Sequence, residues 1–346
     1  MDDNALIRRI HAVDEVSFLS AVYSDKGHSC IAKSDKDKHI CRKADIIIPA
    51  YNVEKYITQC VNSALKQRTK YPYRIIIIDD GSTDSTPQLV DRYKDFTNVL
   101  IIHQKNKGLS GARNAGLAES DAEYLIFLDS DDCLPCNALE KSVDEAERTK
   151  ADIVCGSYYN FLGTKLIHKT HRQKEGIISI NAMRGHAWVK LYKRALFDGI
   201  YFPEGYWYED SVIHQIIAPR ANKIWGISDI LYQRRNNPQS ITHISRGNVK
   251  SMDSLWVTLR LYADREKLGM AITQEYYDYI LSQVVLTNHR IQLLGNEVQA
   301  NTFAVFSKLF QADMQNFATK DHKFEKIQTA LRSGDYELFR EAVQSR

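Results

Sequence analysis

The stretch ADIIIPAYN, residues 44–52, decides the fold of this 346-residue chain. Its three consecutive isoleucines, Ile46–Ile48, have the apolar, β-branched character of a strand that is buried on both faces. The same character recurs at 75–78, 99–102 and 125–128, and segments of helical character lie near 54–66, 85–95, 110–119 and 137–150. Short apolar strands that alternate with helices predict an α/β fold, with a mostly parallel sheet covered by helices on both faces.

Polar residues follow each of the four predicted strands. These segments are 49–52, 79–84, 106–116 and 129–132. In an open parallel sheet, the carboxyl ends of the strands meet at one edge, and ligands bind there. We therefore expect the four segments to converge on one site.

Carboxylates are concentrated in two of these segments. Asp79 and Asp80 follow the second strand, and the sequence Asp129-Ser130-Asp131-Asp132 follows the fourth. Carboxylates gathered at one edge repel one another unless a cation binds there, and Mg²⁺ or Mn²⁺ prefers such oxygen ligands. Helix capping is the alternative; it explains one aspartate per helix but not three in four positions. A D-x-D triplet is a short pattern, and only its position after a strand gives it weight.

Four pieces of the chain together resemble the family-2 inverting glycosyltransferases of the GT-A fold, of the type that builds bacterial surface glycans. They are IIIPAYNVE (46–54), IDDGSTD (78–84), NKGLSGARNAG (106–116) and FLDSDD (127–132), in the family's order and at similar spacing. Shorter matches extend the resemblance to about residue 243: KLY (190–192), YED (208–210) and SIT (240–242). The resemblance implies a Rossmann-like, mostly parallel sheet flanked by helices, a nucleotide-sugar donor and a metal ion.

On the donor side, the resemblance implies that Pro49 and Tyr51 border the nucleotide base, with the tyrosine ring stacked on it. Glu54 would contact the same nucleoside, although a helix dipole also favours a glutamate in the first turn. Asp80 would accept a hydrogen bond from the imide nitrogen of uracil, which favours a UDP-sugar. Asn106 and Arg113 would lie near the ribose and the diphosphate.

The D-x-D residues, Asp129 and Asp131, would face the ribose and bind the metal. We assign Asp131 as the main metal ligand and Asp129 as the second. Asp132 is an extra carboxylate, and the resemblance leaves open which of the three aspartates contacts the ion. His243 would complete the metal shell or be a structural residue. Bound Mn²⁺ or Mg²⁺ would act as a Lewis acid and stabilise charge on the leaving diphosphate.

A displacement at the sugar also needs a base for the acceptor hydroxyl. In the resembling enzymes an E-D pair supplies it, and we assign Asp210 as general base and Glu209 as its orienting neighbour. The reverse assignment and simple helix capping stay open, because spacing cannot separate adjacent carboxylates. Trp188 and Trp207 would either stack on the acceptor sugar or lie in the core.

Composition limits the partners. The net charge of +3 gives no argument for nucleic acid, and no apolar stretch is long enough to cross a bilayer. The start of the chain has no apolar signal core, because charged residues interrupt it: Asp2, Asp3, Arg8 and Arg9. This favours a protein of the cytoplasm, either free there or at the inner face of the cytoplasmic membrane. The six cysteines predict reduced thiols, and the C-x-x-C pair at 133–136 has no second pair for zinc.

The pattern predicts an N-terminal helix and polar linker (1–43), a catalytic domain (44–243, with nucleotide-binding and acceptor-binding halves meeting near 150) and a helical C-terminal region (244–346). The spacing of Met252, Leu255, Trp256, Leu259 and Tyr262 predicts one buried helix face. These helices would pack on the catalytic domain; a homodimer or contact with a membrane surface stays open.

The predicted function is transfer of a hexosyl or N-acetylhexosaminyl group from a UDP-sugar to a hydroxyl of a glycan or glycolipid acceptor, in bacterial surface polysaccharide or lipooligosaccharide synthesis. A sugar-phosphate nucleotidyltransferase is an alternative, but it would have a glycine-rich loop after the first strand instead of PAYN. A catalytically silent GT-A scaffold is another. No G-x-G-x-x-G follows the first strand, which disfavours a dehydrogenase.

Overall fold

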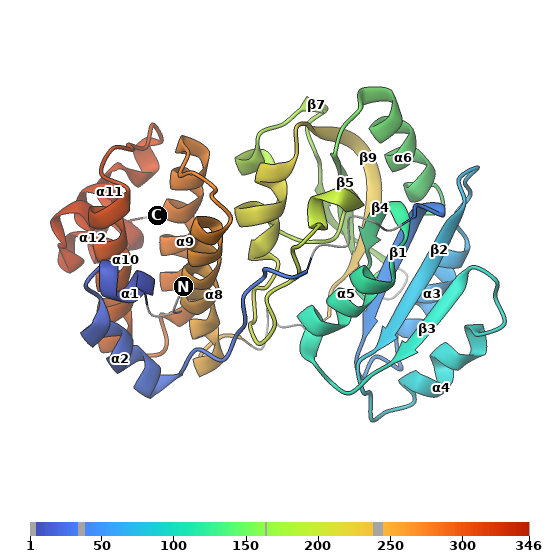
Figure 1. Cartoon of the computed structure of the whole chain (residues 1–346), viewed down its shortest axis with the longest axis horizontal. Helices are drawn as coiled ribbons and strands as arrows, with labels where there is room; N and C mark the ends of the chain where they lie inside the picture. Colours follow the sequence, from blue (N-terminus) through green and yellow to red (C-terminus); the bar gives the residue numbers. More distant parts are fainter. Residues whose placement is uncertain (1–4, 34–38, 163–164, 238–244, 346) are drawn as a thin grey trace. The chain divides into compact units, whose positions relative to one another are not determined.

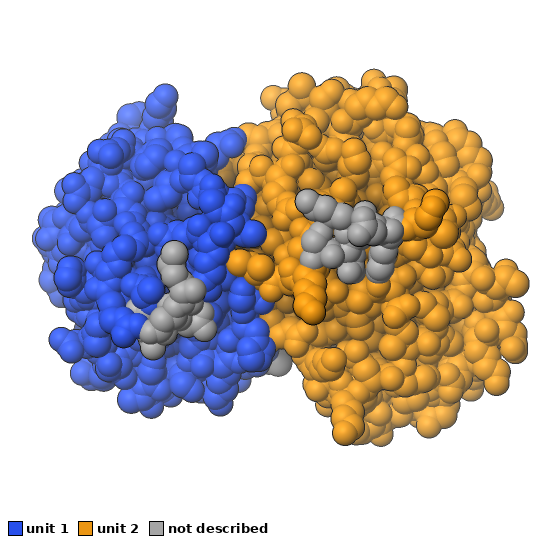
Figure 2. All heavy atoms as spheres, in the orientation of Figure 1, with its two compact units in different colours: residues 1–29, 206–208, 239–346 blue, residues 30–205, 209–238 orange. Residues whose placement is uncertain are grey.

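The computed structural model describes residues 5–33, 39–162, 165–237 and 245–345. Contacts divide the chain into two compact units, drawn in different colours in Figure 2. Unit 1 comprises residues 1–29, 206–208 and 239–346, and unit 2 comprises residues 30–205 and 209–238. The N-terminal helices thus group with the helices at the C-terminal end of the chain.

Unit 2 is built on a mixed sheet, in the order β3-β2-β1-β4-β8-β5-β9-β7, with β6 paired to β5. Its strands are β1 (Arg42–Ala50), β2 (Tyr73–Asp79), β3 (Val99–His103), β4 (Ala122–Phe127), β5 (Ile153–Leu162), β6 (Lys165–His171), β7 (Gly176–Ile177), β8 (Lys190–Lys193) and β9 (Ile224–Arg235). The first four strands pair in parallel, as the sequence predicts. Strand β8 runs antiparallel to both β4 and β5 and joins this half to the second half of the sheet.

Helices cover both faces of the parallel half (Figure 1). They are α3 (Ile57–Leu65), α4 (Thr86–Val90), α5 (Gly108–Glu119) and α6 (Ala138–Thr149). Ile46 and Ile48 of β1 belong to the same core cluster as residues of α3. On the other face α5 approaches closely, and a Cβ added at Gly116 would lie 2.5 Å from Ile47 Cγ2. Because both faces are buried, these strands have continuous apolar sequences.

The regular secondary structure in the described part of unit 1 is helical. Its helices are α1 (Ala5–Arg9), α2 (Val13–Val22), α8 (Asp253–Lys267), α9 (Gln274–Ile291), α10 (Asn296–Asp313), α11 (His322–Ser333) and α12 (Tyr336–Gln344). The sequence predicts one N-terminal helix within 1–43, whereas the structure has two there, α1 and α2, and His11 between them has a φ of 54°. The predicted buried face at 252–262 is confirmed, since all five of its side chains are buried. No helix in the described ranges combines the length and apolar character needed to cross a membrane.

Candidate active site

Hydrogen bonds join the loops that follow β1 and β2. Asn52 Oδ1 accepts a bond from Thr83 N at 2.8 Å, and Glu54 Oε2 accepts one from Ser85 N at 3.0 Å. Asn52 has a φ of 51°, a left-handed conformation that asparagine tolerates better than most residues. Pro49 is buried at the end of β1, whereas the ring of Tyr51 is exposed. Glu54 therefore stabilises the loop, and both Tyr51 and Glu54 are exposed, so their contact with a nucleoside stays a prediction.

Asp80 lies where β2 ends, close to the beginning of α5. Its Oδ1 accepts hydrogen bonds from Gln104 Nε2 at 2.7 Å and from Lys107 N at 2.9 Å. Burial raises the pKa of Asp80, and these bonds lower it in part. Asn106 is exposed, and its Oδ1 accepts a bond from Gly108 N at 3.2 Å, the first residue of the helix. The two loops thus present one buried carboxylate and one exposed amide at the same helix end.

Arg113 on α5 connects the fourth strand end to the E-D pair. Its Nη2 donates to Asp129 Oδ1 at 2.9 Å and its Nη1 donates to Glu209 Oε1 at 2.5 Å. Burial alone would lower the pKa of Arg113, but the two carboxylates raise it. The residue is 2% exposed, so the structure places it between two carboxylates and inside the protein. Contact of Arg113 with a diphosphate stays a prediction.

The three aspartates after β4 have different environments. Asp132 is buried, where its Oδ1 accepts from Arg235 N at 2.6 Å and its Oδ2 accepts from Tyr232 OH at 2.8 Å. Burial, followed by the charges of Asp131 and Asp129, raises the pKa of Asp132 well above its ordinary value. Asp132 therefore attaches this segment to β9.

Asp131 and Asp129 are more accessible than Asp132. Asp131 Oδ2 accepts a bond from Asn237 Nδ2 at 2.9 Å. Burial raises the pKa of Asp131, the bond from Asn237 opposes that rise, and the charge of Asp129 adds to it. The charged form of Asp131 is therefore disfavoured in the protein alone, and a bound cation would stabilise it.

These two aspartates fit a hard divalent cation. They offer oxygen ligands, and their mutual repulsion would fall when a cation binds. Among the residues that the structure describes, no group of three His, Cys, Asp or Glu side chains is arranged to hold a metal ion. Mg²⁺ is commonly held by one or two carboxylates together with substrate phosphates, so two carboxylates suffice. His243, which the sequence resemblance offers as a further metal ligand, lies outside the described residues.

Glu209 and Asp210 are adjacent but differ in accessibility. The side chain of Glu209 is 7% exposed and pairs with Arg113, whereas the side chain of Asp210 is 33% exposed. A group that removes a proton from a bound hydroxyl must reach that hydroxyl. The difference in exposure therefore favours Asp210 over Glu209 as the candidate base, a choice that the spacing of adjacent carboxylates leaves open.

Three planar side chains stack beside Asp210. His186 lies on Trp188 with ring centroids 4.3 Å apart, and Trp188 lies on Tyr232 at 4.7 Å. Trp188 is buried between the two rings, so the structure places it in the core and not at an acceptor surface. Trp207 belongs to unit 1, where its backbone N donates to Asp253 Oδ2 at 2.7 Å.

Lys190 and His186 are not among the site residues that the sequence predicts. Lys190 is buried in β8 and its Nζ donates to the carbonyls of His186 and Trp188. Burial lowers the pKa of Lys190 to about 8. Val189, just before it, has a φ of 63°, which is strained for a β-branched residue and is typical of functional sites. A lysine inside the apolar run AWVKLY (187–192) was the available signal for this residue.

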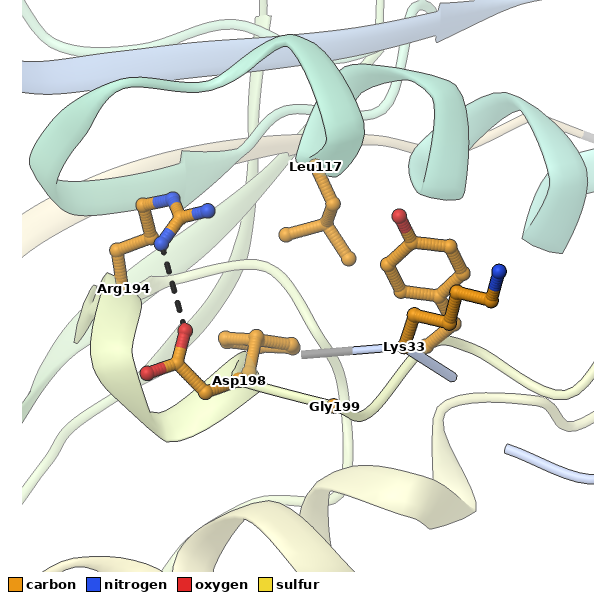
Figure 3. Close-up of a pocket in the computed structure, with 7 residues that line it drawn as sticks. Lys33, Leu117, Arg194, Asp198 and Gly199 are labelled. Carbon is orange, nitrogen blue, oxygen red and sulfur yellow. Dashed lines mark hydrogen bonds and ion pairs between the residues drawn. The ribbon is translucent and has the colours of Figure 1, made fainter. Parts of the chain in front are cut away.

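A separate hollow in unit 2 is lined by none of the predicted site residues (Figure 3). Lys33, Leu117 and Gly199 line it, together with the ion pair between Arg194 and Asp198 at 3.5 Å. Its volume of about 10 Å³ is that of roughly one water molecule. The hollow is too small to hold a sugar.

Comparison with protein families matches residues 45–202 to glycosyl transferase family 2. Glycosyltransferase GlyG of Streptococcus pneumoniae is 32% identical over 216 residues, which cover 57% of this chain and 71% of GlyG. Glycosyltransferase GlyA of the same organism is 30% identical over 221 residues, which cover 58% of this chain. The match spans only 32% of GlyA, so GlyA is much longer than the shared part.

Among solved structures, the chain is similar in fold to residues 1–349 of TarS from S. aureus in complex with UDP-GlcNAc. The TM-score is 0.68 at 20% sequence identity, and the match covers 88% of this chain and 91% of that structure. The GT-A fold that the sequence resemblance implied is therefore confirmed. The family match and the similarity to GlyG agree, and the chain belongs to glycosyl transferase family 2.

Proposed function

We propose that this protein transfers a sugar from a UDP-sugar donor, with inversion, to a hydroxyl group of a glycan or lipid-linked acceptor in bacterial surface-glycan synthesis. One observation supports this proposal above the others. Arg113 bonds both Asp129, at the end of β4, and Glu209, directly before Asp210. Arg113 and Glu209 are buried and thereby connect a residue assigned to the donor with the chain neighbour of the residue assigned as base.

The donor assignment rests on the environment of Asp80 and Tyr51. Asp80 is a buried carboxylate whose pKa is raised by burial, so an added hydrogen bond from a ring N–H would stabilise its charged form. Tyr51 has an exposed ring in the neighbouring loop, suited to stacking on a base. Structures of TarS, similar in fold to this chain, contain UDP-GlcNAc or UDP, which makes UDP-GlcNAc the first donor to test.

In the proposed reaction, Asp210 takes the proton of the acceptor hydroxyl while that oxygen forms a bond to the anomeric carbon. The bond from that carbon to the donor phosphate breaks, and the diphosphate leaves with its electron pair. Glu209 and Arg113 hold the backbone that bears Asp210. Mn²⁺ or Mg²⁺ bound at Asp131 and Asp129 would supply positive charge to the leaving diphosphate.

The test is release of UDP from a panel of UDP-sugars in the presence of Mn²⁺, with water or simple glycosides as acceptors. We expect one donor to be used, and chelation by EDTA to reduce the rate. Failure to release UDP from any donor would contradict the enzymatic function and favour a silent scaffold.

The matched pair of variants is Asp210→Asn and Glu204→Gln. Asp210→Asn should retain UDP binding, measured by calorimetry, and reduce kcat by about 10²- to 10⁴-fold because the base is lost. Glu204→Gln changes a carboxylate that accepts a bond from Asn114 at 3.1 Å and should retain activity. Near-normal turnover by Asp210→Asn would reject Asp210 as the base.

A further inference from the structure

A histidine that the proposed mechanism does not use lies beside the assigned base. His186 Nδ1 is 4.0 Å from Asp210 Oδ2, and the two side chains are 42% and 33% exposed. This distance is too long for a direct hydrogen bond, so a third polar atom can lie between them. Both groups can be reached by a ligand.

We infer that His186 binds the attacking hydroxyl of the acceptor together with Asp210, and so selects and orients the nucleophile. This inference rests on the proposed function. A hydroxyl oxygen about 2.8 Å from both atoms would donate one hydrogen bond to Asp210 Oδ2 and accept one from His186 Nδ1, and the two bonds would meet at about 90°, an angle that a hydroxyl or a water molecule accommodates. His186 is then an acceptor-binding residue, and Asp210 keeps its role as base.

The chemistry requires the imidazole to be neutral with its proton on Nδ1. The hydroxyl donates its proton to Asp210 Oδ2 and accepts a hydrogen bond from His186 Nδ1–H. One lone pair of the oxygen is then left to form the bond to the anomeric carbon. The proton ends on Asp210, and the diphosphate carries away the electron pair of the broken bond.

The surroundings keep His186 in that state. Partial burial, followed by the positive charges of Lys190, Arg234 and Arg184, lowers the pKa of His186 below its ordinary value. The imidazole is therefore neutral at physiological pH and does not form an ion pair that would occupy Asp210. A neutral ring is able to share a hydroxyl with the carboxylate.

The fold also holds the ring in place. His186 stacks on Trp188 with an interplanar angle of 4°, and Lys190 Nζ donates to the His186 backbone carbonyl. Trp188 is in turn packed on Tyr232 and edge-on to Tyr158. Stacking on a buried tryptophan fixes the plane of the ring, as a positioning group for a nucleophile requires.

Two substitutions distinguish the contribution of the Nδ1 hydrogen bond from that of the aromatic ring stacked on Trp188. His186→Phe keeps an aromatic ring on Trp188 but removes both nitrogens. His186→Asn loses the ring, but its amide nitrogen lies close to the position of Nδ1. The control is His171→Phe, because His171 also stacks on an aromatic ring, that of Tyr158, with centroids 4.4 Å apart.

The readout is the rate of UDP release from the donor that the wild-type protein uses, with water as acceptor, together with the Kd for UDP. We expect His186→Phe to lower kcat by about 10- to 100-fold with an unchanged Kd, and His186→Asn to recover at least about a third of the wild-type rate. His171→Phe should behave as wild type. Tryptophan fluorescence of the variants reports whether the stack on Trp188 is retained.

Normal turnover by His186→Phe, equal loss in His186→Phe and His186→Asn, or a parallel loss of UDP affinity would each overturn this inference. The proposed function fails separately, when the wild-type protein releases no UDP from any donor, whereas a fully active Asp210→Asn rejects only Asp210 as the base. If Asp210→Asn loses turnover as expected but His186→Phe keeps wild-type turnover, only the role of His186 is rejected.

Discussion

Arg113 Nη1 donates a hydrogen bond to Glu209 Oε1 at 2.5 Å, and both side chains are almost completely buried. The same guanidinium donates to Asp129, so one cation compensates two carboxylates that come from different parts of the sequence. Its Nε has no hydrogen-bond partner among the described residues. The stability of the fold is sensitive to the geometry of such a buried cation, because leaving either carboxylate unpaired inside the protein costs free energy.

Replacing Arg113 by lysine should therefore be strongly destabilising. A lysine ammonium is a point charge and cannot bond both carboxylates in the arrangement of the planar guanidinium, so one buried carboxylate loses its partner. We expect a loss of about 3 kcal/mol in the free energy of unfolding, measured by urea denaturation. Arg148→Lys is the control, because Arg148 pairs with Glu145 on the surface and its side chain is 61% exposed. Equal losses in the two variants would show that the buried bridge has no special weight.

The environments of Asp131 and Asp132 predict different effects on metal binding. Asp131→Asn should weaken Mn²⁺ binding in the presence of UDP by at least about tenfold, since it removes a charged ligand. Asp132→Asn should leave Mn²⁺ affinity nearly unchanged and lower the midpoint of thermal unfolding, because Asp132 bonds Tyr232 and the backbone of Arg235. Manganese titration followed by electron paramagnetic resonance measures the first quantity. A larger loss of affinity in Asp132→Asn would reverse the assignment.

Asp253 predicts a pH dependence of stability within unit 1. Burial, opposed by the bond from Trp207 N, raises the pKa of Asp253 from 3.8 to about 6. The folded state therefore holds this proton more tightly than the unfolded state. The stabilisation is complete below about pH 4 and is lost as the pH rises through 6; the difference corresponds to about 3 kcal/mol.

Asp253→Asn removes this titration. Its free energy of unfolding should fall less than that of the wild-type protein between pH 4 and pH 7, in urea denaturation at each pH. Identical pH profiles for the two proteins would contradict the prediction.

Gly116 tests the close contact between α5 and the sheet. On helix propensity alone, Gly116→Ala would stabilise the protein by about 1 kcal/mol. A Cβ there would lie 2.5 Å from Ile47 Cγ2 and 3.0 Å from Ile78 Cδ1, so the helix or the side chains must move. We expect a net loss of about 1–2 kcal/mol in the free energy of unfolding. Combined with Ile47→Ala, the substitution should cost less than it does alone, and a simple sum of the two losses would rule out the contact.

Sequence patterns alone determined the parallel half of the sheet and the edge at which its polar segments meet. Ile46–Ile48 and Ile75–Ile78 pair in register, Ile46 with Ile75 and Ile48 with Ile77. Such strands can be recognised locally because burial on both faces requires an apolar residue at every position. The buried face at 252–262 was predictable for a similar reason, since helix periodicity places those side chains on one side.

Only the tertiary structure decided which carboxylates are buried and which are accessible. Asp132 is enclosed because Tyr232 and Arg235, about a hundred residues later, bond it, and Glu209 is enclosed because Arg113 does. The position of His186 next to Asp210 likewise depends on the stack with Trp188 and Tyr232. Spacing along the chain describes one element at a time, whereas the environment of a titratable group depends on side chains that distant elements place around it.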